Sequence, residues 1–101
     1  MQTELYRYVF SEAVLMEDVE ETLVLAIFGA QALHGETRFR MDAAHAFDAQ
    51  LRSCVIDANT QVGRDLNRLF AGFARHEYGD EAFTVRRISE TPNEPITEMA
   101  A

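Results

Sequence analysis

Two hydrophobic periods alternate along this chain, and their order is the feature that most constrains its fold. Every second residue from Leu5 to Phe10 suits one face of a β-strand, whereas the apolar residues from Val19 to Leu33 recur with the spacing of an α-helix. Two strand-like runs follow at residues 37–46 and 52–58. A second helical run covers residues 62–78, and a last strand-like run covers residues 82–88. The sequence therefore predicts the element order βαββαβ.

This order indicates a ferredoxin-like α+β sandwich, in which two helices cover one face of a four-stranded antiparallel sheet. A chain of 101 residues suits one such domain. We expect the domain to comprise residues 1–88, because the hydrophobic pattern ends at Ser89. Residues 89–101 contain two prolines and three glutamates, and they predict a flexible acidic tail.

Local signals mark the ends of the helical runs. Gly35 and Gly79 follow the two runs in the position where a left-handed residue ends a helix. Asn59 or Thr60 precedes the second run as an N-cap. Inside that run, Gly72 predicts a place where another element approaches closely.

Composition narrows the location and the partners. No stretch approaches the roughly 20 apolar residues that span a bilayer, the first residues do not form a secretory leader, and Cys54 is a single cysteine. We therefore predict a cytoplasmic protein with no membrane partner. The formal net charge of −8 argues against binding to the phosphate backbone of nucleic acids. All nine basic residues are arginine, which excludes a Schiff-base or P-loop lysine.

Residues that would indicate a metal site or nucleophilic catalysis are few. His34, His45 and His76 do not have the i, i+3 or i, i+4 spacing of a helical metal site, so we predict no metal and no cofactor. His34 and His76 fall in the last turns of the helical runs, where a cation suits the helix dipole. Cys54 falls on the strand face that should meet the helices and predicts a buried, unreactive thiol.

The sheet face that points away from the helices is the best candidate for a functional surface. If Phe39 and Cys54 face the helices, this face collects aliphatic side chains and arginines, namely Leu5, Arg7, Val9, Arg38, Arg40, Val55 and Arg86. A solvated sheet face carries few apolar residues, and arginine is enriched in protein interfaces. RNA-recognition motifs share this topology and use the same face, but residues 52–58 lack the aromatic residues on which bases stack.

We therefore predict a non-catalytic interaction or regulatory module that forms a homodimer or binds a protein partner through this face. The plain alternative is a solvent-facing sheet with ion pairs within it. A second alternative is a small-molecule-binding protein or enzyme, with a pocket between sheet and helices in a dimer. Arg38 or Arg40 would then hold an anionic group, and His45 or Asp57 would transfer a proton. A third is an acidic decoy for a basic nucleic-acid-binding surface.

The first helical run carries more apolar residues than contact with the sheet requires. Val24, Leu25, Phe28 and Leu33 lie off the stripe that would face the sheet, so something besides the sheet is expected to cover this helix. Residues 16–33 also hold four acids and no base, which would suit a basic protein partner. Acids in the first turns of a helix have a structural explanation as well, because they suit the helix dipole.

Overall fold

The computed structural model describes residues 4–88, and the predicted acidic tail at residues 89–101 lies outside the described residues. One four-stranded antiparallel sheet has the order β2-β3-β1-β4, with the strands β1 (Leu5–Phe10), β2 (His45–Asp48), β3 (Ser53–Asp57) and β4 (Phe83–Ile88). The helical elements of this part of the chain are α1 (Met16–His34), α2 (Glu36–Asp42), α3 (Gln61–Tyr78) and the 3₁₀ turn η1 (Asp80–Ala82). The predicted α+β class with a four-stranded antiparallel sheet is confirmed.

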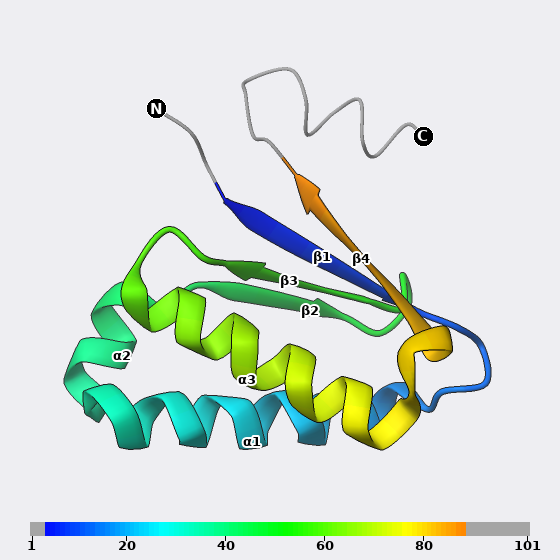
Figure 1. Ribbon diagram of the computed structural model, residues 1–101, viewed down its shortest axis with the longest axis horizontal. Coiled ribbons are helices and arrows are strands. Elements are labelled where there is room, and N and C mark those ends of the chain that lie inside the picture. The colour runs from blue at the N-terminus through cyan, green and yellow to red at the C-terminus, as the bar shows by residue number, and fades with distance from the viewer. Residues whose placement is uncertain (1–3, 89–101) are drawn as a thin grey trace.

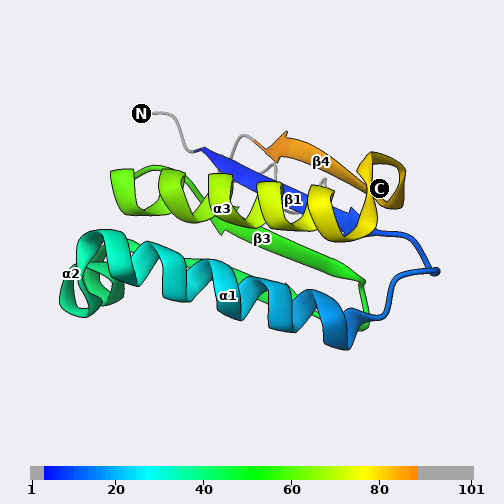
Figure 2. The same ribbon diagram turned by 60° about the horizontal axis from the view of Figure 1, so that its bottom comes forward.

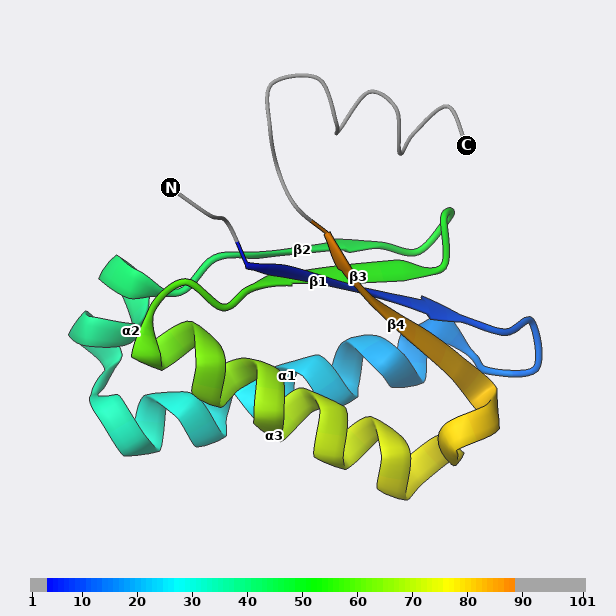
Figure 3. The ribbon, with the colours of Figure 1, turned by 45° about the horizontal axis from the view of Figure 1, so that its top comes forward.

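Helices α1 and α3 lie side by side against one face of the sheet (Figure 1). Figure 3 shows the sheet as one layer and the helices as a second layer beneath it, with α2 at one end of the helix layer. The face of α1 that meets the sheet carries the buried residues Met16, Val19, Thr22, Leu23, Ala26 and Ala30. Apart from the adjacent Thr22 and Leu23, these residues recur every three or four positions, as the sequence periodicity predicts.

Both long helices end at a glycine with a positive φ angle, a backbone conformation that other residues rarely adopt. Gly35 follows α1 with φ of 89° and Gly79 follows α3 with φ of 87°, as predicted. Thr60 is the N-cap of α3, because its Oγ1 accepts a hydrogen bond of 3.0 Å from the backbone N–H of Gly63.

The core fills the space between the sheet and the two long helices. Tyr8, Phe10, Cys54, Ile56 and Phe83 enter it from the strands. They meet residues of α1 and α3 that include Val19, Leu66 and Phe70. The rings of Tyr8 and Phe70 pack edge to face with centroids 4.8 Å apart. The Tyr8 hydroxyl also donates a 2.6 Å hydrogen bond to Asn67 Oδ1, so the polar tip of this buried ring has a partner.

The prediction of a strand at residues 37–46 is wrong, because Glu36–Asp42 forms helix α2 and β2 begins only at His45. In a strand, Phe39 and Met41 would share one face. Phe39 is 8% exposed and Met41 is 76% exposed, which fits a short helix that presents one ring to the core. The predicted two-helix layer therefore gains a third helix, and the predicted loop at residues 47–50 moves to residues 49–52.

Arg52, in the turn between β2 and β3, connects this turn to the C-terminal end of β1 through hydrogen bonds. Arg52 has a positive φ of 54°, and its Nε donates a 3.1 Å hydrogen bond to the carbonyl of Phe10. Its terminal Nη2 donates to the carbonyls of Ser11 and Val14 in the loop that leads into α1. This side chain holds β1, the β2–β3 hairpin and the start of α1 together.

Within residues 4–88, none of the helices is both long and apolar enough to span a bilayer.

Candidate functional site

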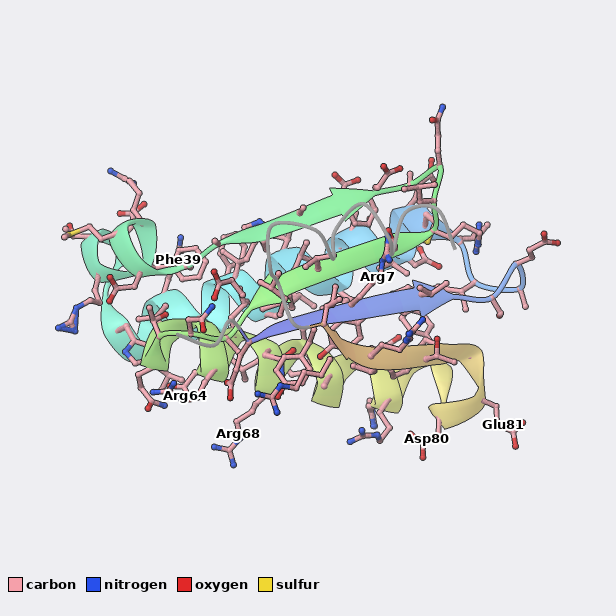
Figure 4. All side chains as sticks on the ribbon, turned by 90° about the horizontal axis from the view of Figure 1, so that it is seen from above. Arg7, Phe39, Arg64, Arg68, Asp80 and Glu81 are labelled. Atoms are coloured by element: carbon pink, nitrogen blue, oxygen red, sulfur yellow. The ribbon has the colours of Figure 1, made fainter. Side chains whose placement is uncertain are left out.

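The sheet face opposite the helices is the candidate functional site, and strand pairing defines its residues. Tyr8 pairs with Cys54 and Val85, so their neighbours in each strand point to the other face. Three rows of paired residues cross β3, β1 and β4 on that face: Asp57–Leu5–Ile88, Val55–Arg7–Arg86 and Ser53–Val9–Thr84. We call this surface the open face. Figure 4 looks onto it, with Arg7 labelled and the helices behind the strands.

Five of the seven residues predicted for the interface lie on the open face. Leu5, Arg7 and Val9 alternate along β1, and Val55 and Arg86 flank Arg7 in register. The alternation in β1, β3 and β4 therefore has the phase that the sequence predicts. That these residues form an interface stays a prediction.

Arg38 and Arg40 do not belong to the open face. Both lie on α2, where Arg38 Nε is 3.6 Å from Asp42 Oδ2 and Arg40 Nη2 is 3.6 Å from Glu36 Oε2. These are ion pairs between residues four positions apart on a helix. The predicted placement on the sheet was wrong because alternating arginines look alike in a strand and in one turn of an exposed helix.

Sequence reasoning missed two residues of the open face because it placed β2 too early. Ala46 pairs with Val55 and Asp48 pairs with Ser53, so both lie on the open face beside β3. The signal was present in the alternation His45–Ala46–Phe47–Asp48, in which Phe47 packs against the core and pairs with Cys54.

Opposite charges occupy opposite halves of the open face. Arg7 and Arg86 are directly paired across β1 and β4. Asp48 and Asp57 lie on β2 and β3. Aliphatic side chains lie between the two halves: Leu5 and Val55 are half-buried, and Val9 is 39% exposed. The face is thus an apolar surface with a positive edge and a negative edge.

His45 and Asp57 line the same depression at one end of the sheet, as the ligand-binding alternative requires, but the space beside them is small. His45 pairs with the core residue Ile56, so it lies on the helix side of β2 and not on the open face. A depression of about 190 Å³ is lined by Leu5, Ala44, His45, Ala46, Val55 and Asp57. Pockets for small molecules usually start at about 300 Å³. Loss of hydration lowers the pKa of His45 below its usual value of 6.5.

The carboxylate of Asp57 has a structural role. Its Oδ1 accepts hydrogen bonds from the backbone N–H of Asn59 at 2.8 Å and from Asn59 Nδ2 at 2.6 Å. These bonds shape the turn that leads from β3 toward α3. The two arginines assigned to the same pocket, Arg38 and Arg40, do not line the depression. The space between sheet and helices is filled by core side chains, including Tyr8, Phe39 and Phe83.

The structure also accounts for Cys54, His34 and Asp65, one by burial and two by a hydrogen bond between helices. Cys54 is fully buried, and burial raises the pKa of its thiol to about 12, as expected for an unreactive cysteine. His34, the last residue of α1, donates from Nε2 to Asp65 Oδ2 on α3 at 2.7 Å. That hydrogen bond is the main reason why the pKa of Asp65 lies below its usual value of 3.8. Among residues 4–88, no three His, Cys, Asp or Glu side chains form a group that could hold a metal ion.

Comparison of the chain with protein-family models, with curated proteins and with solved structures finds no match. Its function must therefore be inferred from its own residues and their arrangement.

Proposed function

We propose that this protein is a non-catalytic module that forms a homodimer through the open face of its sheet. The observation that carries the proposal is the division of that face into an arginine half and an aspartate half with aliphatic residues between them. An interface between identical copies must be complementary to itself, and a face with two opposite charged halves meets that condition.

The positions of the charges select one orientation for the two copies. A two-fold axis that runs parallel to the strands, between two stacked sheets, sets the β1–β4 half of each copy against the β2–β3 half of the other. Arg86 would then meet Asp48 of the second copy, and Arg7 would meet Asp57. The members of each pair differ by one row of residues along the strands, about 7 Å, which a long arginine side chain can span.

Burial of the aliphatic residues supplies the attraction in this arrangement, and the charges set the register. Leu5, Val9 and Val55 lie in the middle of the open face, where a second sheet would remove them from water. An axis perpendicular to the strands would instead bring like charges together, so the charge pattern disfavours that orientation.

We also propose that the fold is a ferredoxin-like sandwich with one inserted helix. Without α2 and the 3₁₀ turn η1 the element order is βαββαβ, and the sheet read from β4 has the order β4-β1-β3-β2. The cytoplasm is the proposed location, because the only cysteine, Cys54, is buried and forms no disulfide. We propose no cofactor, no nucleic acid and no membrane as a partner.

The oligomeric state tests the main proposal. Light scattering at tens of micromolar protein is expected to give twice the chain mass of 11.4 kDa. Val9→Asp and Val55→Asp should each give a monomer with an unchanged circular dichroism spectrum. Val85→Asp is the matched control, because Val85 is 42% exposed against 39% for Val9 but belongs to the other face of the sheet. A monomeric wild type would refute the dimer.

A charge exchange tests the orientation separately. Arg86→Glu and Asp48→Arg should each weaken the dimer, because each places like charges across the interface. The double variant should restore association, since it only exchanges the two partners. If the double variant is weaker than both single variants, the proposed axis is wrong even though a dimer exists.

A further inference from the structure

The outer side of the helix layer carries a groove between α1 and α3. It has a volume of about 370 Å³ and is lined by Asp18, Glu21, Thr22, Leu25, Phe73, His76, Glu77 and Tyr78. Figure 2 looks toward these two helices, which run side by side in opposite directions. The Thr22 and Tyr78 hydroxyls, 3.0 Å apart, share a hydrogen bond that joins the two helices at the groove. A second depression of about 470 Å³ continues over α1 and is lined by Glu20, Glu21, Val24 and Leu25.

The apolar side chains of this groove are far more exposed to solvent than side chains that pack in the core. Leu25 and Phe73 line the groove and are 59% and 36% exposed. Val24 lines the second depression and is 40% exposed, and Phe28, outside both linings on α1, is 60% exposed. Three of them follow one another on α1 within five residues, and Phe73 faces Leu25 from α3 across the groove. The three residues on α1 belong to the apolar surplus that the sequence predicts for the first helix, together with Leu33. Within residues 4–88, all four are among the exposed large hydrophobic side chains.

The rim of the groove is mainly acidic, with His76 as the one basic side chain in its lining. Asp18, Glu20 and Glu21 line it from α1, and Glu77 lines it from α3. Neither lining includes an arginine, and Arg75, which precedes His76 on α3, is directed to the 3₁₀ turn, where its Nε lies 2.8 Å from Asp80 Oδ1. A partner must therefore bring apolar side chains to the floor and positive charge to the rim.

We propose that this groove binds a basic amphipathic helix of another protein. A groove between two adjacent helices accepts a third helix, whose apolar residues at i, i+3, i+4 and i+7 enter the floor. Lysine or arginine residues beside that apolar stripe would then pair with the acids of the rim. Leu25 on α1 and Phe73 on α3 line the groove from its two sides and provide the apolar contacts for that stripe.

The charge of the rim argues against the other occupants. A second copy would bring the same four acids to the same place, and like charges across an interface are unfavourable. Residues 89–101 of the chain itself carry three glutamates and no basic residue. Anionic lipid and nucleic acid surfaces are repelled for the same reason. Only a basic partner satisfies both the floor and the rim.

Three synthetic peptides of equal length test this proposal by fluorescence anisotropy. The first is an 18-residue helical peptide with leucine at i, i+3, i+4 and i+7 and arginine between. The second has glutamate in place of each arginine, and the third has the composition of the first in scrambled order. We expect the first peptide to bind at least about tenfold more tightly than either of the others, since only it matches both surfaces.

Variants of the protein locate the binding site. Leu25→Ser and Phe73→Ser should each weaken binding of the first peptide by about tenfold, because each removes an apolar contact of the groove that the helix would bury. Leu51→Ser is the matched control, since Leu51 is 61% exposed but does not line the groove. Circular dichroism of the three variants checks that they fold. Glu21→Gln should weaken binding at low salt more than at high salt.

The outcomes separate this proposal from others. Equal binding of the first and scrambled peptides, or equal effects of Leu25→Ser and Leu51→Ser, would show attraction by net charge alone and would overturn the proposal. Failure of the first peptide to bind would overturn it as well. The Val9→Asp variant, altered on the open face, should bind the first peptide like the wild type, so the result does not depend on dimer formation.

Discussion

Replacement of Gly63 by alanine is expected to destabilise the protein strongly, although alanine is the better helix former. Gly63 lies in the first turn of α3, where the helix starts directly beneath the end of β3. A Cβ atom at this position would lie 2.0 Å from the backbone oxygen of Asp57 and 3.1 Å from its carbonyl carbon. The neighbour is backbone of the sheet and cannot rotate away, so α3 would have to move.

The size of the effect follows from three contributions. The overlap requires a shift of more than 1 Å, and overpacking of this kind costs about 3 kcal/mol. The shift also disturbs the hydrogen bond from the Gly63 N–H to Thr60 Oγ1, which is worth about 1 kcal/mol as an N-cap. The higher helix propensity of alanine returns about 1 kcal/mol. We expect a net loss of about 3 kcal/mol in the free energy of unfolding, or a fall in Tm of about 12–24 °C.

Gly72→Ala provides the matched control within the same helix. No atom lies within 4 Å of the place where its Cβ would be, so only the helix propensity changes. This variant should gain about 1 kcal/mol and melt about 4–8 °C higher than the wild type. Urea titration and scanning calorimetry of the three proteins measure both effects, with unchanged m-values as the check that the same structure unfolds.

Two results would refute the reasoning. If Gly63→Ala melts within a few degrees of the wild type, α3 can move away from β3 without cost, and the close approach does not constrain the fold. If Gly72→Ala loses as much stability as Gly63→Ala, the effect belongs to the helix as a whole and not to the contact with Asp57.

Three further predictions concern polar groups inside the fold. The hydrogen bond from His34 lowers the pKa of Asp65, so its stabilising effect is complete above 3.8 and is lost as pH falls through the lower folded value. Urea titrations from pH 6 to pH 2 should therefore show a smaller acid-induced loss for Asp65→Asn than for the wild type, and parallel curves would contradict this. Tyr8→Phe should lower the free energy of unfolding by about 1 kcal/mol, because Asn67 Oδ1 loses its donor; no change would mean that water replaces the hydroxyl. The buried Cys54 thiol, with a pKa of about 12, should react with a disulfide reagent at least about 100-fold more slowly in the folded protein than in denaturant, and rapid labelling would disprove its burial.

The element that sequence reasoning misjudged shows where a local pattern runs out of information. Residues 36–42 alternate charged and apolar side chains over a stretch too short for a helical period to be recognised. In the folded protein the pairs Glu36–Arg40 and Arg38–Asp42 and the single buried ring of Phe39 favour a helix. Gly72 was likewise singled out for a close approach that occurs at Gly63, because nothing local to either glycine records which one lies beneath β3.

The candidate surfaces were predictable to different degrees for a related reason. The alternation in β1, β3 and β4 was long enough to assign Leu5, Arg7, Val9, Val55 and Arg86 to one face. Asp48 falls in the predicted loop at residues 47–50, because the alternation His45–Ala46–Phe47–Asp48 covers only four residues and overlaps the strand predicted at 37–46. The groove on the helix layer required Leu25 and Phe73 to be seen together, and they lie on helices far apart in the chain.

The sequence by itself determined the long elements and which side of each is apolar, because side-chain alternation and helical spacing are properties of neighbouring residues. It also determined that the apolar face of the first helix exceeds what one sheet can cover. Only the tertiary structure decided that residues 36–42 form a helix, that the arginines and aspartates of the sheet occupy opposite halves, and that acids from α1 and α3 surround one groove. Those outcomes depend on strand order and on the side-by-side packing of the helices, which bring together residues that no local pattern connects.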